Sequence, residues 1–303
     1  MAKKIYEQAI TSCYSTWGTT YFRDYYRSKT AYPPVHQDLV KRELQKHGAK
    51  SLLDAGCGPA SMLRGLRFLG PQRYGFDLTP EMVAEARRVL GRQEVPADQV
   101  WLGSVLDLKS YRPERSSRAL RYDSAICFGV LPHIPAHADM EVFSNLRASL
   151  KRGGLAMVEA RNELFSLFTA NRYSHEFVRD RLINADGLLK KAGRKKSKIQ
   201  QALKMYEDFF RMDLPPVRKG KRDEPGYDEV LSRLHNPLVA RDQFARCGFK
   251  DVRVLFYHYH CLPPMFEAMA PEFFREQSLL LEQPDDWRGH FMASAFVLAG
   301  IAT

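Results

Sequence analysis

Two acidic residues and a glycine loop have the types and spacing that point to chemistry in this sequence. The stretch SLLDAGCGP carries Asp54 at the end of an apolar run, followed by Gly56 and Gly58. A second acid, Asp77, lies near the end of the run RYGFDL, 23 residues after Asp54. Glycines at such a turn let backbone N–H groups approach a ligand, and an acid at about this spacing reaches a ribose hydroxyl. The pattern therefore indicates a nucleotide-type cofactor.

Two cofactor classes compete for this loop, a dinucleotide and S-adenosylmethionine. A dinucleotide fingerprint requires G-x-G-x-x-G with a pyrophosphate at the helix end, but Ser61 stands where the third glycine belongs. Asp54, directly before the loop, would repel a pyrophosphate and attract a cofactor that carries an ammonium and a sulfonium. The loop thus favours S-adenosylmethionine.

The elements that must position these residues follow an alternating pattern. Strands are expected at 50–56, 73–78, 100–105, 122–130 and 155–160, and helices at 61–70, 80–92 and 139–154. The pattern resumes near the end of the chain with a helix and two apolar strands within 240–259 and 290–301. Strands that alternate with helices predict an α/β fold with a doubly wound, mostly parallel sheet.

The same pattern suggests three parts of the chain. Residues 1–46 read as an N-terminal helical segment, interrupted at Pro33 and Pro34 because proline cannot continue a helix. Residues 47–161 and 240–303 form the sheet domain, and 162–239 form a mainly helical insertion.

The insertion carries most of the net positive charge of the chain. The formal net charge is +11, and residues 179–222 hold fourteen Lys or Arg against five Asp or Glu. A charge run is usually a solvated face; otherwise it attracts an anion such as a phosphorylated or lipid-linked glycan, or RNA. Aromatic residues interleaved for base stacking are missing from the stretch KKAGRKKSK, which disfavours RNA.

The composition also limits the class of protein. No apolar run reaches the roughly 18 residues that a membrane span needs, and the first residues lack the apolar core of a secretory signal. The five cysteines are scattered without a CxxC pair, and no His, Asp or Glu set has metal-ligand spacing. We therefore expect a cytoplasmic protein without a disulfide framework or a metal site.

Five motifs together resemble a known family. LLDAGCGP, YGFDLTPEMVAEAR, GSVLDL, YDSAICFGVLPHIP and LKRGGLAMVEAR resemble, in this order, the motifs of class I S-adenosylmethionine-dependent methyltransferases. The resemblance covers about residues 50–161 and is weaker over 240–302. It implies a Rossmann-like methyltransferase fold and an enzyme that uses S-adenosyl-L-methionine and releases S-adenosyl-L-homocysteine.

The resemblance implies cofactor-binding roles for residues of the first two strands. Asp54, Gly56 and Gly58 match the positions that line the amino-acid end of the cofactor. Asp77 matches the acceptor of the ribose hydroxyls, and Leu78 lies beside the adenine.

Further cofactor contacts are implied farther along the chain and at its start. Ser104 and Val105 stand where many members have an acid and a small residue against the adenine, so Ser104 is a departure from the family. Phe128 matches the floor of the methyl-donor site. Many members close the pocket with an N-terminal helix, which makes Trp17 and Tyr21 candidate contacts, with core packing as the alternative.

Candidate residues for the methyl acceptor lie after the fourth strand and beyond. His133 follows that strand and titrates near neutrality, so it is the candidate general base, with scaffolding as the alternative. Arg161, Asn162 and Glu163 leave the fifth strand at the sheet edge where ligands bind, and His258 shares a strand face with His260. The candidate substrate contacts are Arg161, Asn162, Glu163 and His258.

These observations predict a methyltransferase that acts at oxygen on a small molecule or glycan, possibly anionic, in a biosynthetic pathway. One alternative is an RNA methyltransferase that uses the basic insertion. The other is a non-catalytic protein that only binds the cofactor.

Overall fold

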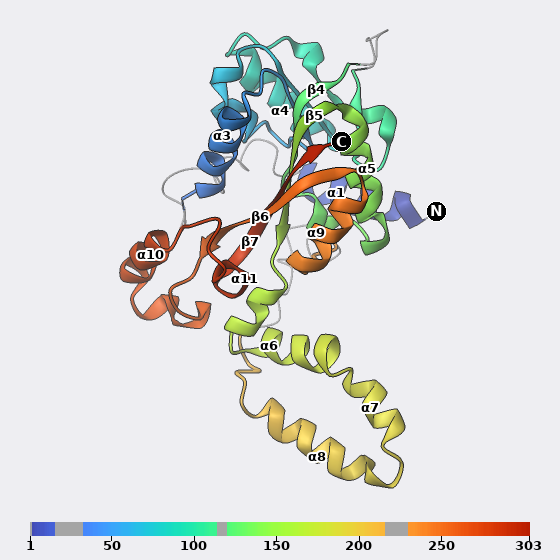
Figure 1. Ribbon diagram of the computed structural model, residues 1–303, viewed down its shortest axis with the longest axis vertical. Helices are drawn as coiled ribbons and strands as arrows, with labels where there is room; N and C mark the ends of the chain where they lie inside the picture. Colours follow the sequence, from blue (N-terminus) through green and yellow to red (C-terminus); the bar gives the residue numbers. More distant parts are fainter. Residues whose placement is uncertain (1, 16–32, 114–119, 216–229) are drawn as a thin grey trace.

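The central element is a twisted sheet, and the helices α6 (Arg172–Glu176), α7 (Ala185–Lys191) and α8 (Lys196–Glu207) lie beyond its end (Figure 1). The structure is a computed structural model that describes residues 2–15, 33–113, 120–215 and 230–303. Within these residues seven strands form one sheet in the order β3-β2-β1-β4-β5-β7-β6. The strands are β1 Leu52–Ala55, β2 Arg73–Asp77, β3 Val100–Leu102, β4 Tyr122–Cys127, β5 Leu150–Arg161, β6 Phe249–Tyr259 and β7 Ala293–Ala302.

The strand directions confirm the predicted fold class. Neighbouring strands from β3 to β5 are parallel, whereas β7 is antiparallel to both β5 and β6. The sheet grows from β1 in two directions: β2 and β3 lie on one side of it, and β4 and β5 lie on the other. Parallel strands end at the same edge of a sheet, so the carboxyl ends of β1, β2, β3 and β4 meet there, which is where such sheets bind ligands.

Helices cover both faces of the sheet. Helices α3 (Val35–His47) and α4 (Pro80–Gly91) pack on one face, and α5 (Asp139–Ser149) and α9 (Pro237–Arg246) pack on the other. Successive strand residues enter opposite layers, because side chains alternate along a strand: in β1, one cluster holds Leu52 and the other holds Leu53. Continuous apolar runs in the sequence are thus explained by burial on both faces.

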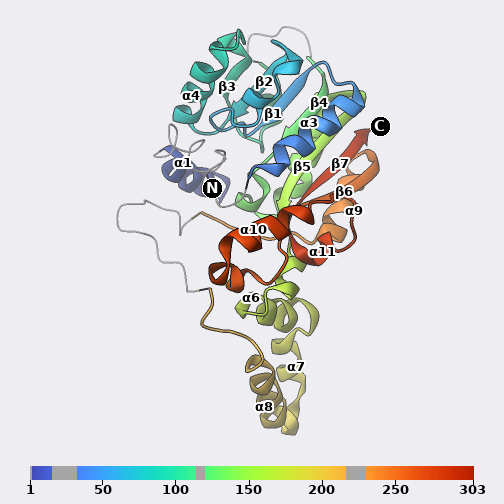
Figure 2. The same ribbon diagram turned by 90° about the vertical axis from the view of Figure 1, so that its left-hand side faces the viewer.

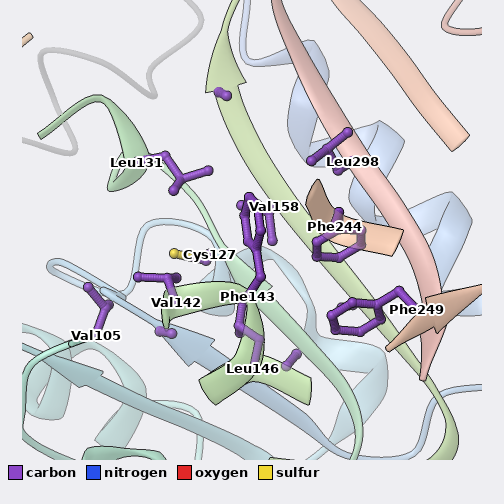
Figure 3. Close-up of a cluster of buried hydrophobic side chains, with 14 of the residues drawn as sticks. Val105, Cys127, Leu131, Val142, Phe143, Leu146, Val158, Phe244, Phe249 and Leu298 are labelled. Atoms are coloured by element: carbon purple, nitrogen blue, oxygen red, sulfur yellow. The ribbon is translucent and has the colours of Figure 1, made fainter. Parts of the chain in front are cut away.

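Aromatic packing joins the parallel part of the sheet to its antiparallel end. Phe143 of α5 meets Phe244 of α9 edge to face, with ring centroids 5.1 Å apart, and Phe244 stacks on Phe249 of β6 at 4.0 Å. Figure 3 shows these rings among Leu146, Val158 and their neighbours in one buried cluster. The two halves of the predicted sheet domain therefore share one core.

Proline and glycine lie at the ends of two helices. Pro80 is the first residue of α4, and Pro34 immediately precedes α3. Gly48 ends α3 with a left-handed φ of 70° and satisfies the last turn of carbonyl groups.

The helix predicted at 61–70 was wrong, because this stretch forms two short 3-10 turns, η1 (Leu63–Gly65) and η2 (Arg67–Leu69). Arg73 from the next strand explains the difference. Its guanidinium is buried and donates hydrogen bonds to the carbonyls of Leu63, at 3.1 Å, and Gly70, at 2.7 Å. Carbonyls bound in this way, together with Gly65, favour turns over a regular helix.

The remaining helices lie outside the two layers. These are α1 Ala2–Ser15, α6 Arg172–Glu176, the π-helical segment η8 Phe177–Leu182, α7 Ala185–Lys191, α8 Lys196–Glu207, α10 Pro271–Leu280 and α11 Gly289–Met292. Further 3-10 turns lie at Ala97–Gln99, Leu108–Tyr111, Leu131–His133, Ala136–Ala138, Leu164–Phe168, Gly193–Lys195 and Pro264–Met269. Residues 162–215 contain mainly helices and turns. Among the described residues, no helix is long and apolar enough to cross a membrane.

Candidate active site

The carboxyl ends of the parallel strands open into a cleft of about 950 Å³, a volume that includes its solvent-filled mouth. Its walls come from the loops after β1, β2, β3 and β4, and helix α1 contributes Glu7, Ile10 and Tyr14. These three side chains recur at three- and four-residue steps, so they lie on one face of α1. The cleft is therefore bounded by the sheet edge and by the N-terminal helix.

The glycine loop after β1 is shaped by backbone hydrogen bonds. The N–H groups of Gly56 and Cys57 both donate to the carbonyl of Phe76, at 2.9 Å. Gly56 has a φ of +83°, and a Cβ atom there would lie 2.4 Å from Val130. Only glycine fits, because both the backbone conformation and the space exclude a side chain.

Two carboxylates lie at the ends of adjacent strands in the wall of this cleft. Asp54 is 2% exposed, and burial, then the nearby charge of Asp77, raises its pKa to about 8. Burial also raises the pKa of Asp77, although its oxygens accept from the N–H groups of Gly58, at 2.8 Å, and Thr79, at 2.9 Å. A cation in the cleft would stabilise the charged form of Asp54, which burial and the neighbouring charge of Asp77 disfavour.

A third carboxylate enters the cleft from α1. The Ser104 hydroxyl donates to Oε1 of Glu7 at 2.5 Å and accepts from the N–H of Leu106 at 3.1 Å. Ser104 is the position at which the sequence departs from the family's usual acid. Glu7 therefore brings a carboxylate to the corner where residue 104 itself has none.

His133 has its tautomer fixed by its surroundings. Its Nδ1 lies 2.8 Å from the carbonyl of Leu231, which can only accept, so Nδ1 carries the proton. Nε2 is then the acceptor for the Tyr14 hydroxyl at 3.0 Å. Burial lowers the pKa of His133, so its ring is neutral at pH 7. Nε2 therefore carries the lone pair that can accept a proton, and in this structure the Tyr14 hydroxyl donates to it.

A strap (residues 230–235) holds the turn that carries His133. The N–H of Arg233 donates to the carbonyl of Pro132 at 2.9 Å, and its Nε donates to the carbonyl of Ile134 at 2.6 Å. The same guanidinium pairs with the buried carboxylate of Asp139 at 2.5 Å. One arginine thus connects the strap, the turn and the start of α5.

Glu159 of β5 joins the loop after β4 to the antiparallel end of the sheet. It accepts from the N–H of Gly129 at 2.5 Å and from the hydroxyl of Tyr257 at 3.0 Å. Phe128, which lines the cleft, lies beside these residues in sequence and in space. The carboxylate therefore fixes the loop that forms the cleft floor.

A row of histidines continues from Phe128 away from the cleft. His36 of α3 stacks on Phe128 with ring centroids 6.3 Å apart, and His258 stacks on His260 at 5.1 Å. Burial lowers the pKa of His36 and His258 to about 4 and that of His260 to about 3. His260 also meets Phe165 at 4.8 Å. At pH 7 this row is a neutral, aromatic surface.

The structure brings most of the predicted cofactor residues into the one cleft. Its walls include Asp54, Gly56, Gly58, Asp77, Leu78, Ser104, Val105 and Phe128, together with the candidate base His133. Trp17 and Tyr21 lie outside the described residues. Within those that are described, no group of three or more His, Cys, Asp or Glu side chains is arranged to hold a metal ion.

None of the four predicted substrate residues lines this cleft: His258 lies in the histidine row, and Arg161, Asn162 and Glu163 make other contacts. Asn162 is 1% exposed, and its amide donates to the carbonyls of three residues around α11, so it holds the end of β5 against that helix. Glu163 pairs with Arg181 at 2.7 Å, and Arg161 donates to Ser232 of the strap. These contacts correct the expectation: the side chains join the insertion and strap to the sheet instead of lining the cleft.

Sequence reasoning missed Glu7, Glu159 and His36. Glu159 lies near the end of the fifth strand beside other polar residues, and only its contacts with Gly129 and Tyr257 distinguish it. The only signal for Glu7 was its place on one helical face with Ile10 and Tyr14. Nothing local distinguishes His36, because its partners come from β4 and β6.

Comparison with known proteins decides the family. Residues 26–196, more than half of the chain, match the family described as "Methyltransferase domain". The chain belongs to the class I methyltransferases.

Similar proteins agree with this assignment. This methyltransferase is 28% identical over 145 residues to the ubiquinone biosynthesis O-methyltransferase of Xanthomonas campestris pv. campestris (strain B100), and 30% identical over 146 residues to that of Xanthomonas euvesicatoria pv. vesicatoria (strain 85-10). Each match covers 48% of this chain and 56% of the relative, so the chain spans about half the length of the curated relatives it matches.

A solved structure shows the same fold. The crystal structure of magnesium protoporphyrin IX methyltransferase from Synechocystis PCC 6803 with bound SAM superposes with a TM-score of 0.50. It is 14% identical, and the superposition covers 98% of this chain and 97% of that one.

The raised pKa of Asp54 predicts a pH-dependent stability. Between about pH 4 and pH 8 the folded protein keeps a proton that the unfolded chain has lost, so rising pH destabilises the fold by up to about 1.4 kcal/mol per pH unit. Asp54→Asn removes this term. We expect urea unfolding without cofactor to show the variant gaining on the parent as the pH rises through that window.

The exposed Asp98→Asn is the matched control, and its curve should run parallel to the parent's at every pH. A constant difference between Asp54→Asn and the parent across the window would contradict the assigned pKa.

Proposed function

We propose that this methyltransferase uses S-adenosylmethionine to methylate a hydroxyl oxygen on a small molecule or glycan. The observation that carries the proposal is the pair of buried acids, Asp54 and Asp77, in a cleft that also holds a neutral histidine with a fixed tautomer. The names of the similar proteins, which are O-methyltransferases, support oxygen as the methylated atom.

The donor set fits a cationic cofactor of this kind. Asp54 would face the ammonium and sulfonium groups, and the loop of Gly56 and Gly58 would lie against the amino-acid end. Asp77 would accept from the ribose hydroxyls. Bound there, the cofactor supplies a methyl group on a positively charged sulfur, which is a good leaving group.

The adenine end would be held by residues from two distant parts of the chain. Leu78 and Val105 offer apolar contact, and the pair of Ser104 and Glu7 offers a carboxylate acceptor for the exocyclic amino group. Glu7 would thereby compensate for the serine at position 104. Helix α1 is then part of the cofactor site as well as its cover.

His133 is the proposed general base. Its Nε2 lone pair faces the cleft, where an acceptor hydroxyl would compete with Tyr14 for it. The proton of that hydroxyl would pass to Nε2 as its oxygen becomes bonded to carbon. The Nδ1–H···O=C bond to Leu231 persists and stabilises the imidazolium that forms.

The histidine row supports a ring-bearing acceptor. His36, His258 and His260 are neutral at pH 7 and lie with Phe128 and Phe165 in one aromatic row. Flat rings pack well against aromatic side chains of this kind. His258 therefore remains a proposed substrate contact, and the row favours an uncharged ring over a phosphate.

Removing the Asp77 carboxylate tests the cofactor site. Asp77→Ala should weaken S-adenosylmethionine binding by about 1–3 kcal/mol, because charged hydrogen bonds to the ribose are lost. Isothermal titration calorimetry measures this, and the exposed Asp98→Ala should bind as the parent does. Unchanged affinity in a folded Asp77→Ala protein would remove the assignment.

Mutation of His133 tests the base. His133→Ala should lower methyl transfer to a panel of catechols and phenolic acids by about 10²-fold or more, while cofactor affinity stays near the parent value. His137→Ala, an exposed histidine four residues away, is the matched control and should keep full activity. Arg233→Met, which loosens the turn, should lower the rate and shift its pH profile. A fully active His133→Ala enzyme would return this residue to scaffolding.

A further inference from the structure

A hairpin arm (residues 171–211) projects from the body of the molecule away from the sheet, as Figures 1 and 2 both show. Its outgoing part is α6, η8 and α7, and its returning part is α8, which packs against α7. At the base, Asn171 and Arg211 form a β-bridge, and Arg172 donates to the carbonyl of Met212 at 2.6 Å. The arm thus holds its far end clear of the methyltransferase core.

The far end is a basic tip (residues 190–198) without a negative partner. It has six basic residues and no acid, and all six are exposed: Lys190, Lys191, Arg194, Lys195, Lys196 and Lys198. In the described part of the chain, none of them forms an ion pair. Other basic residues of the arm do so: Arg179 with Asp186, Arg181 with Glu163, Lys204 with Glu207 and Arg211 with Asp213. The charge of the tip is therefore available to an external anion.

Large apolar side chains are exposed on the same arm. Phe209 is 82% exposed and Met205 is 62% exposed. On the outgoing part of the arm, Leu182 is 62% exposed and Leu188 is 45% exposed. Met205 lies on the outer face of α8, whereas Leu203 on the opposite face is partly covered. Lys204 adjoins Met205 and Lys190 lies two residues after Leu188, whereas Glu207 and Asp208 precede Phe209. Exposed apolar side chains beside lysines are a feature of helices that lie in a membrane interface.

We propose that the arm binds the surface of a membrane that contains anionic phospholipids. The basic tip would contact lipid phosphates, and the exposed apolar side chains would enter the boundary between headgroups and acyl chains. A second copy of this chain is a poor partner, because its tip carries the same charge. RNA would use the lysines and could stack on Phe209, but it offers nothing to Leu182, Leu188 and Met205.

A second exposed apolar region provides a contrast within the molecule. Around α10, Met269 is 80% and Phe273 59% exposed, but the charges beside them include Glu267, Glu272 and Glu276. Acidic residues are repelled by anionic lipid, so this region should not bind such a membrane. The α10 region therefore serves as a control that has exposed apolar side chains but acidic neighbours.

The test uses the full chain and sedimentation with vesicles. We expect binding to phosphatidylcholine vesicles that contain about one quarter phosphatidylglycerol, little binding to pure phosphatidylcholine, and weakening with salt. Lys195→Glu combined with Lys196→Glu should reduce the affinity at least tenfold, and so should Met205→Ser combined with Phe209→Ser. Both double variants should still bind S-adenosylmethionine, which separates this inference from the proposed methyl transfer.

Matched controls lie outside the arm. Met269→Ser with Phe273→Ser removes an equal pair of exposed side chains, and Lys41→Glu with Lys46→Glu reverses two exposed lysines of α3. Both should bind vesicles as the parent does. Absent binding, equal binding to both vesicle types, or equal loss in the controls would overturn the proposal. Tight, steeply salt-dependent binding to a generic RNA, lost on reversal of Lys195 and Lys196, with no vesicle binding, would replace lipid by RNA.

Discussion

The rest of the site depends on one unfavourable placement, the burial of the Asp54 carboxyl group, to which repulsion from the charge of Asp77 adds. Parallel pairing of β1 and β2 fixes both at the same sheet edge, and burial removes the water that would screen them. Two backbone N–H groups donate hydrogen bonds to Asp77, whereas Asp54 retains a proton up to about pH 8. A cationic ligand would relieve this repulsion, so the strand pairing that builds the core also creates the binding preference of the cleft.

The reacting groups are held by segments far from this edge in sequence. Helix α1 closes the cleft with Glu7 at one end and Tyr14 at the other, through Ser104 and His133. The strap fixes His133 from behind with the carbonyl of Leu231, so the ring can present only one nitrogen to the cleft. A parallel sheet thus supplies the charge of the site, and the added segments supply its proton acceptor and its cover.

The sequence predicted what depends on local pattern. Buried strands and the glycine loop are local signals, and the fold class followed from them, whereas the resemblance to a known family implied most of the cleft residues. The helix expected at 61–70 failed because Arg73, from the next strand, binds carbonyls of that stretch. Asn162 misled because a polar residue at a strand end serves a ligand or the backbone equally well. Glu7, His36 and Arg233 act through contacts with distant segments, which no single stretch of sequence encodes.

The central claim is that Asp54 releases its proton to the solvent when the cationic cofactor binds. Calorimetric titration of the protein with S-adenosylmethionine at about pH 6.5, in buffers of different ionisation enthalpy, counts the protons exchanged on binding. The account predicts release of close to one proton per bound cofactor in the parent and none in Asp54→Asn. Binding without proton release, or equal release in both proteins, would contradict it.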